Sequence, residues 1–283
     1  MTDAREDIAA HYDGVIASYR KYWAPVLSVF SQPLREAART NWTAPPRILD
    51  LGSGPGSPAL SLRKPGSDLG ESQGTIVRGD LSAAMLLAAR ENGSGDFHEL
   101  LVRLDAARLP FPAATFDLIA CTFVLQHIRE KGRALAEACR VLATGGQLIT
   151  ASWMGKDPGN AAFSAVEDLL MSFGAPEADP HPVPVWTEEL QDPESMRRLL
   201  KDAGFSDCRV WTETPNHTWT AETLLAYCLG QGARGRRFGR LPPGRQAALR
   251  NKARSALESL PPSDFIWSHE VIYVVAEGPD RTD

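Results

Sequence analysis

The chain is poor in cysteine, and its four cysteines lie far apart, at Cys121, Cys139, Cys208 and Cys228. A disulfide scaffold needs more cysteines in a shorter chain, and a zinc site usually shows closely spaced pairs, so the pattern argues against both. We therefore expect reduced, mostly buried thiols, no bound metal, and a protein of the reducing cytoplasm.

Long apolar runs and an excess of one charge are also lacking. The longest apolar run, around residues 118–125, is far shorter than the ~20 residues of a transmembrane helix. Residues 1–7 are polar and lack the apolar core of a signal peptide. Thirty basic against 35 acidic residues give a net charge of −5, which provides no overall attraction to nucleic acid or to an anionic membrane. We expect a soluble globular protein with neither as its partner.

Residues 231–257 depart from this balance, with eight basic side chains and no acidic one. Such a stretch can bind RNA, but it can equally be the solvated face of a helix. Because Phe238 is the only aromatic residue in it, we favour the structural explanation.

Short apolar, β-branched runs alternate with amphipathic stretches in the first half of the chain. This alternation predicts a parallel sheet with crossover helices. The expected strands are 47–51, 74–79, 98–104, 116–122 and 146–152, and the expected helices are 82–91 and 131–142.

The second half is more irregular. Its pattern predicts helices over 160–173, 193–203, 220–229 and 244–260, and strands over 207–213 and 265–276. The first forty residues are rich in aromatics and predict helices ahead of the sheet. We therefore divide the chain into an N-terminal helical lid (1–44), a ligand-binding core (45–155), and a remainder with helical insertions that bind a second ligand (156–283).

A glycine-rich turn follows the first strand, with glycine at positions 52, 54 and 56. Such a turn lets the backbone approach a ligand at the carboxyl edge of an open α/β sheet. A dinucleotide fits the glycine spacing formally, but Pro55 and Pro58 remove amide donors that a pyrophosphate would need. Asp50 would also repel a pyrophosphate. S-adenosylmethionine carries a sulfonium, an ammonium and no phosphate, and suits the turn better.

The segment Asp50-Leu-Gly52-Ser-Gly54-Pro-Gly56 resembles the first motif of class I S-adenosylmethionine-dependent methyltransferases. Segments similar to four further motifs follow in the family's order, at residues 79–85, 104–112, 116–127 and 140–146. One departure is Ala143-Thr144, where the family often has Lys-Pro. The resemblance implies a seven-stranded Rossmann-like sheet with helices on both faces and one reversed strand near the end.

It also implies roles for individual residues. Asp80 would accept hydrogen bonds from both ribose hydroxyls, and Asp105 would face the adenine amino group. Met85 would either stack on the adenine or face the core, and His127 would either lie beside the transferred methyl group or be a loop histidine. The expected cofactor-binding residues are Asp50, Gly52, Gly54, Gly56, Asp80, Leu81, Met85, Asp105, Ala106, Thr122 and His127.

The acceptor side is less defined. A hydroxyl acceptor would profit from a histidine base, and the candidates are His11, His127, His181, His217 and His269. Tyr19 or Tyr22 is expected to line the reaction chamber, and Tyr19 and His127 are the candidate catalytic residues. Aromatic residues of the second half suggest an apolar or aromatic acceptor: Trp153, Phe163, Trp186, Trp211 and Trp219.

The resulting prediction is methyl transfer to the oxygen or carbon of a small metabolite, in natural-product biosynthesis. RNA or protein methylation is an alternative, although Thr122-Phe-Val-Leu stands where base-methylating members often carry Asn/Asp-Pro-Pro-aromatic. A non-catalytic module that only binds S-adenosylmethionine is another. A homo-oligomer is compatible with each.

Overall fold

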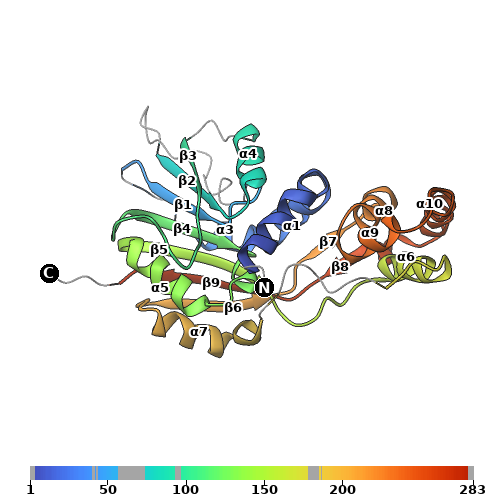
Figure 1. Cartoon of the computed structure of the whole chain (residues 1–283). Helices are drawn as coiled ribbons and strands as arrows, with labels where there is room; N and C mark the ends of the chain where they lie inside the picture. Colours follow the sequence, from blue (N-terminus) through green and yellow to red (C-terminus); the bar gives the residue numbers. More distant parts are fainter. Residues whose placement is uncertain are drawn as a thin grey trace.

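A computed structural model describes residues 4–39, 42, 44–56, 74–92, 97–177, 185 and 187–279. Its centre is a seven-stranded sheet in the order β3-β2-β1-β4-β5-β9-β6 (Figure 1). Only β9 runs antiparallel to its two neighbours. The strands are β1 (Arg47–Leu51), β2 (Thr75–Asp80), β3 (His98–Arg103), β4 (Phe116–Thr122), β5 (Leu142–Trp153), β6 (Cys208–Glu213) and β9 (Val271–Glu277). The predicted fold class is confirmed.

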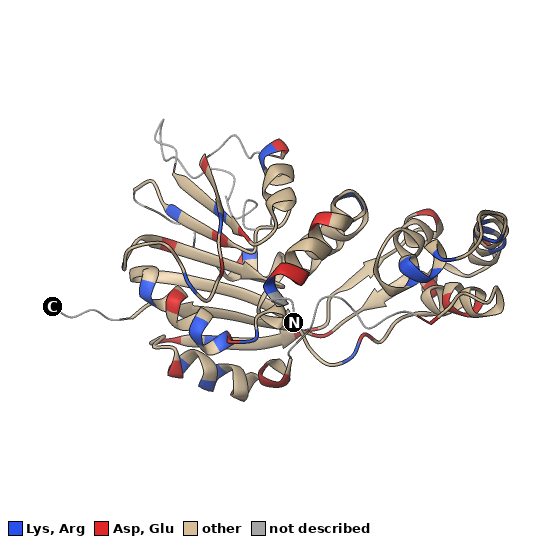
Figure 2. Cartoon of the chain, in the orientation of Figure 1, with Lys and Arg blue, Asp and Glu red and all other residues tan. Residues whose placement is uncertain are grey.

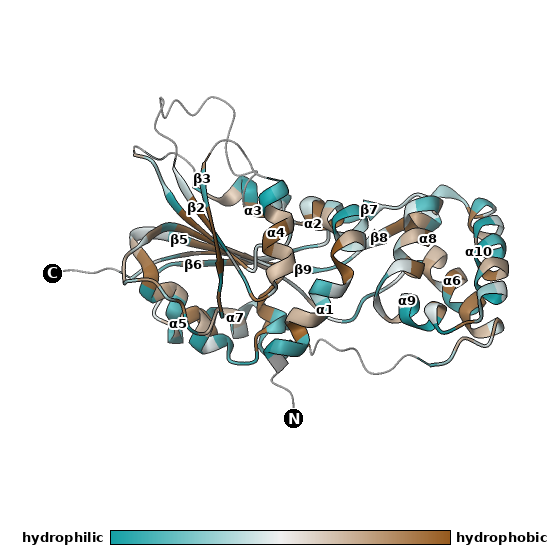
Figure 3. Ribbon diagram, turned by 45° about the horizontal axis from the view of Figure 1, so that its top comes forward, coloured by the Kyte–Doolittle hydropathy of each residue, from teal (hydrophilic) through white to brown (hydrophobic). Residues whose placement is uncertain are grey.

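Helices cover both faces of the sheet because consecutive strand residues point to opposite sides. Ile48 packs toward α2 (Ala24–Phe30) and α3 (Gln32–Ala37), whereas Leu49 packs toward α5 (Lys131–Val141) and α7 (Pro193–Asp202). Two apolar clusters result, and the brown strands between them mark the core in Figure 3. The Tyr273 hydroxyl donates to the Phe30 carbonyl at 2.8 Å and ties α2 to β9.

The N-terminal helices lie beside the carboxyl edge of the sheet. α1 (Ala4–Ser18) packs along α4 (Ala83–Glu91) and continues into a π-helical turn, Tyr19–Trp23, before α2 begins. Ser82 caps α4, because its hydroxyl accepts a hydrogen bond from the Met85 amide. The helices predicted for this region are confirmed.

The remaining helices form a lobe beside the sheet (Figure 1). They are α6 (Ala161–Ser172), α8 (Ala221–Gly230), α9 (Gly232–Gly239) and α10 (Pro243–Glu258), next to a two-stranded sheet of β7 (Asn216–Thr218) and β8 (Ile266–Ser268). The prediction of one long strand over 265–276 is wrong. The chain breaks it at His269 and Glu270, so that β8 pairs with β7 and β9 enters the main sheet.

The basic stretch 231–257 lies in this lobe, where Figure 2 colours the Lys and Arg positions of α9 and α10 blue. Arg234 and Arg237 both contact Glu167 of α6. Arg237 and Arg245 also donate to the Pro176 and Phe173 carbonyls, just beyond the C-terminus of α6. Cations are favourable at that end of a helix, so the structural explanation of this stretch is supported.

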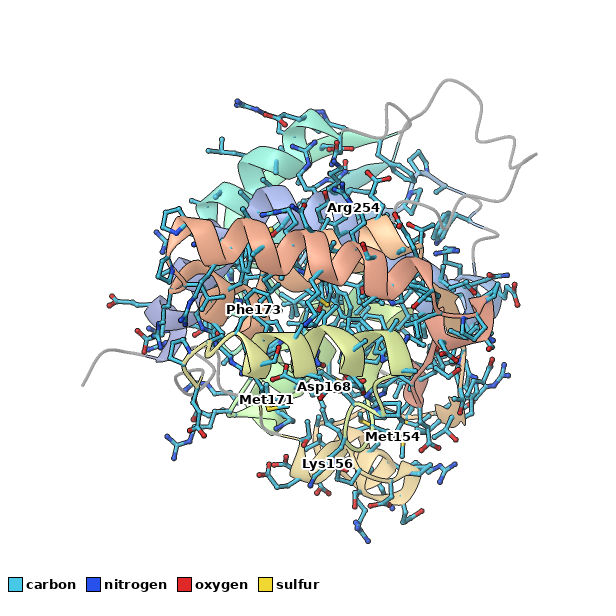
Figure 4. The ribbon with its side chains drawn as sticks, turned by 90° about the vertical axis from the view of Figure 1, so that its right-hand side faces the viewer. Met154, Lys156, Asp168, Met171, Phe173 and Arg254 are labelled. Atoms are coloured by element: carbon cyan, nitrogen blue, oxygen red, sulfur yellow. The ribbon has the colours of Figure 1, made fainter. Side chains whose placement is uncertain are left out.

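Figure 4 looks onto the outer face of the lobe, where Met171 and Phe173 project from the end of α6 and Arg254 from α10. In the described part of the chain, no helix is both long and apolar enough to span a bilayer.

Candidate active site

A cavity of about 790 Å³ opens at the carboxyl ends of β1, β2 and β4. Strand order reverses between β1 and β4, so this is the crevice in which open α/β sheets bind ligands. Its volume is toward the upper end of the ~300–1,000 Å³ usual for small-molecule sites. Its walls come from the loops after these strands and from α1.

The glycine turn forms one wall. Gly52 and Gly54 have φ of 69° and 53°, where a side chain is strained. A Cβ on Gly52 would overlap Val124 in the loop after β4, so the two loops can meet only if this residue is glycine. A Cβ on Gly54 would meet no described atom within 4 Å, because Gly54 faces the cavity. The turn therefore leaves room for a ligand against its backbone.

The carboxylate of Asp80 lies at the end of β2 and lines the cavity. Its two oxygens accept hydrogen bonds from the amides of Gly54 and Ser82, both at 2.9 Å. Burial raises the pKa of Asp80 and the charge of Asp13 raises it further, whereas these backbone hydrogen bonds lower it. The site thus holds a carboxylate in a fixed orientation, with remaining lone pairs for hydroxyl donors.

Asp105 lines the cavity after β3 and is bound from two sides. One oxygen accepts from the Ala107 amide at 2.9 Å, and the other pairs with Arg5 of α1 at 2.8 Å. The predicted adenine-facing acid is therefore also a contact point for the N-terminal helix.

The structure brings most of the predicted cofactor residues together around this cavity. Asp50 and Gly56 are the two that do not line it. Asp50 is 1% exposed beneath the turn, and its charge acts with burial to raise the pKa of Cys121 to about 12. Pro58 lies outside the described residues. The lining residues among those predicted are Gly52, Gly54, Asp80, Leu81, Met85, Asp105, Ala106, Thr122 and His127.

Of the candidate histidines that the structure describes, His127 lines the cavity. The Tyr12 hydroxyl lies 3.1 Å from its Nε2, and the two rings meet edge to face. Tyr19 lines the cavity as well and contacts Tyr12 edge to face, whereas Tyr22 is not part of the wall. Burial and the nearby Asp80 raise the pKa of Tyr12 well above its ordinary value. Tyr12 therefore keeps its proton at neutral pH, and its hydroxyl can donate a hydrogen bond to Nε2 when the proton of a neutral His127 is on Nδ1.

The other histidines and the aromatic residues of the second half lie elsewhere. His11 packs on Tyr12, His217 on Trp219, and His269 between Trp153 and Trp267. His181 and Trp186 are outside the described residues. Trp153, Phe163 and Trp219 belong to or pack against one core cluster, and Trp211 stacks on Tyr273. No described residue beyond Arg133 lines the cavity, so its wall comes from the first half of the chain. These aromatics are occupied in joining the lobe to the sheet.

Sequence reasoning missed Arg5 and Ile8 as members of the site, and it did not pair Tyr12, one of the N-terminal aromatic residues, with His127. Arg5, Ile8 and Tyr12 are spaced as i, i+3 and i+7, which places them on one face of α1. Tyr19 follows Tyr12 by another seven residues and continues the same face. The same spacing in the sequence could have identified this face. Arg129, Glu130 and Arg133 at the start of α5 were also missed.

Phe123 follows β4 with a φ of 57°, a rare conformation for an aromatic residue. Phe123 lines the cavity, and its ring stacks on Trp153 with 4.3 Å between the ring centroids. Its amide donates to the Ala151 carbonyl, and its carbonyl accepts from the buried Gln126 side chain, both at 2.7 Å. These contacts hold the backbone in a strained turn that directs the loop 124–128 toward the cavity.

The strain at Phe123 predicts that glycine is tolerated better than alanine at this position, the reverse of the usual order in a strand. Both Phe123→Ala and Phe123→Gly lose the ring and about 3–5 kcal/mol of stability. Glycine tolerates positive φ, so Phe123→Gly should be the more stable by about 1 kcal/mol in urea unfolding. At Phe116, which is buried at the start of β4 and does not have a positive φ, the alanine variant should instead be the more stable. If the alanine and glycine variants had the same order of stability at Phe123 and at Phe116, the strained turn would be contradicted.

The residues that line the cavity fit S-adenosylmethionine. Gly54 leaves open space against the backbone, Asp80 offers oriented acceptors, and Leu81, Met85 and Leu104 supply an apolar surface for a flat ring. Within the described residues, no group of three or more His, Cys, Asp or Glu could hold a metal ion.

Comparison with known proteins agrees with this fit. A family model described as a methyltransferase domain matches residues 49–150. The demethylmenaquinone methyltransferase of Thermus thermophilus is 32% identical over 179 residues, which are 58% of this chain and 76% of that protein. The ubiquinone/menaquinone biosynthesis C-methyltransferase of Xanthomonas oryzae is 30% identical over 177 residues, which are 57% of this chain and 66% of that protein.

A solved structure extends the likeness to the whole fold. Phosphoethanolamine N-methyltransferase 2 of Haemonchus contortus, in complex with S-adenosylhomocysteine, superposes with a TM-score of 0.56 at 18% identity, covering 99% of this chain and 61% of that one. This agreement covers the sheet order, the glycine turn and the relatives. It rules out both the dinucleotide as cofactor and the module that only binds S-adenosylmethionine. The chain belongs to the class I S-adenosylmethionine-dependent methyltransferases and is an enzyme that transfers a methyl group from S-adenosylmethionine.

Proposed function

We propose that the enzyme methylates a small aromatic or apolar metabolite that carries a hydroxyl group, at carbon or oxygen, in the cytoplasm. The observation that carries this proposal is the Tyr12–His127 pair, which lies on the wall of the same cavity as Asp80. Tyr19 and Phe123 add aromatic surface to that wall. A small flat acceptor can pack against such rings, and its hydroxyl can reach the Tyr12–His127 pair.

His127 is the proposed general base. In the tautomer with its proton on Nδ1, Nε2 accepts a hydrogen bond from Tyr12 and can take up a proton. Because this lone pair already faces Tyr12, the acceptor hydroxyl gives its proton to the Tyr12 oxygen while Tyr12 passes its own proton to Nε2. Deprotonation makes an oxygen, or the ring carbon conjugated with it, a stronger nucleophile.

S-adenosylmethionine supplies a methyl group carried on positively charged sulfur. Asp80 would hold its ribose, Asp105 and the apolar residues Leu81 and Met85 its adenine, and the glycine turn its amino-acid end. Transfer from such a centre demands alignment and exclusion of water, which this chain provides through the cavity walls.

The names of the relatives support carbon as the reacting atom. Two of them are named for quinone biosynthesis, and the Xanthomonas protein is named a C-methyltransferase. A hydroxylated aromatic ring activated by His127 would suit such a reaction. We extend this to a specialised natural product, because the ring of Tyr19 packs edge to face on Tyr12 and enlarges the aromatic surface beside the pair.

We further propose that α1 is a lid, as part of an N-terminal segment 1–44 ahead of the core 45–155. It contributes Arg5, Ile8 and Tyr12 to the cavity wall. The segment 156–283 completes the sheet and adds the lobe, which supports the lid through a 2.9 Å hydrogen bond between Ser18 and Gln231.

The test is a panel of phenols, hydroquinones, primary amines and short basic peptides, assayed by release of S-adenosylhomocysteine. We expect turnover with the hydroxylated rings and a product whose mass rises by one methyl group. Turnover confined to amines or peptides would contradict the proposal and favour the protein-methylation alternative.

Asp80 gives a separate prediction on the cofactor side. Asp80→Ala should weaken S-adenosylhomocysteine binding by about 1.5–3 kcal/mol, because hydrogen bonds to a charged group are lost. Calorimetry measures this directly, and Asp207→Ala, an exposed acid before β6, is the matched control. An Asp80 variant that binds as tightly as wild type would show that this carboxylate does not hold the ribose.

A further inference from the structure

Besides the contact between Tyr12 and His127, the N-terminal segment makes polar contacts at three further places around the predicted cofactor site. Near the start of α1, Arg5 pairs with Asp105. In its middle, the Asp13 carboxylate accepts a hydrogen bond from the Ser82 hydroxyl, two residues after Asp80. Just beyond its end, Arg20 donates to Asn92 at 2.9 Å, and Asn92 donates to the Pro55 carbonyl of the glycine turn at 2.8 Å.

The middle contact is the one best placed to hold the helix down. Arg5 and Glu91, the ion-pair partner of Arg20, are more than half exposed, and exposed ion pairs contribute little. Asp13 is exposed as well, but its partner Ser82 is only 1% exposed and caps α4 while it donates to Asp13. Asp13 also accepts from the Ala84 amide at 3.3 Å. A carboxylate of α1 thus completes the N-terminal cap of a helix that carries Met85 of the cavity wall.

We propose that Asp13 is a positioning residue that latches α1 over the cofactor, so that cofactor and product leave only when its contact with Ser82 and Ala84 breaks. Ser82 connects the docking of α1 with the orientation of the Asp80 carboxylate. Its amide donates to Asp80, and its hydroxyl donates to Asp13, so one residue touches both the ribose-binding carboxylate and the lid. Closure of α1 over the cavity and the fixed orientation of Asp80 are therefore coupled through Ser82.

This inference rests on the proposed lid role of α1 and is independent of the acceptor. Its test is the dissociation rate of S-adenosylhomocysteine, measured by stopped-flow displacement for wild type, Asp13→Ala, Asp13→Asn and Glu6→Ala. Loss of a cap contact corresponds to a rate increase of roughly 2- to 30-fold for Asp13→Ala. Asp13→Asn keeps an acceptor oxygen and should stay within about twofold of wild type. Glu6→Ala removes an exposed acid from the same helix and should leave the rate unchanged.

Amide hydrogen exchange tests separately whether Asp13 latches α1 and whether α1 is a lid. In wild type, S-adenosylhomocysteine should slow exchange of the α1 amides, and in Asp13→Ala this protection should shrink while the melting temperature of the free protein stays close to wild type. A normal dissociation rate and full protection in Asp13→Ala would overturn the latch and leave the lid intact. Wild-type α1 amides that do not respond to bound S-adenosylhomocysteine would overturn both.

Discussion

Replacing His127 by glutamine should lower kcat for a hydroxylated aromatic acceptor by about 10²–10⁴-fold, the usual contribution of a general base. Glutamine keeps a polar side chain of similar reach, but it cannot take up a proton at neutral pH. The fold should be unaffected, because His127 is the last residue of a short 3-10 helix, Leu125–His127, at the cavity wall. The measurement is release of S-adenosylhomocysteine at saturating acceptor.

Two companion measurements show whether the loss is one of proton transfer. Tyr12→Phe removes the hydroxyl that contacts Nε2 but keeps the ring, so it should reduce kcat by less than His127→Gln does. Raising the pH should partly restore the His127→Gln variant, because more of a phenolic acceptor ionises in solution. A kcat within a few-fold of wild type at neutral pH would show that the acceptor needs no base, or that the base is another residue.

Deleting residues 1–18 should reduce turnover by more than about 100-fold while the remaining chain stays folded. The deletion removes Arg5, Ile8 and Tyr12 from the cavity wall and opens the reaction site to water. Neither apolar cluster contains a described residue of α1, so the core should tolerate its loss. The cut leaves Trp23, which stacks on Tyr227 and supports the lobe.

Circular dichroism and a melting curve check the fold of the truncated chain, and calorimetry checks its cofactor site. We expect S-adenosylhomocysteine to bind with only modestly lower affinity, since Asp80 and the glycine turn belong to the sheet. A truncated protein that is folded and turns over at near the wild-type rate would show that α1 is not a lid.

The cofactor side of the site could be predicted from the sequence because its residues stand at the ends of parallel strands. Carboxyl ends of such strands meet at one edge of the sheet, so the glycine turn, Asp80, Asp105 and Thr122 are brought together by topology alone. Each is marked by a local pattern a few residues long. The class of fold followed from the same alternation of strands and helices, and β9, the one reversed strand, was expected from the resemblance.

The acceptor side depended on contacts between distant parts of the chain. Tyr12 meets His127 across 115 positions, and Asp13 meets Ser82 across 69. Helical spacing from Tyr12 favours Tyr19 on the cavity face, but the π-helical turn Tyr19–Trp23 decides where the residues after Tyr19 point.

The same holds for the second half of the molecule. Its helices were visible as periodic patterns, but their place beside the sheet, away from the cavity, depended on aromatic packing around Trp153 and Trp267. The break at His269 and Glu270 was equally hidden, because the runs on both sides of it are apolar and read as one strand. Short-range pattern thus determined the elements and the cofactor motifs. Long-range packing alone decided which side chains close the reaction chamber, since the free energy of such contacts depends on residues that the local sequence does not contain.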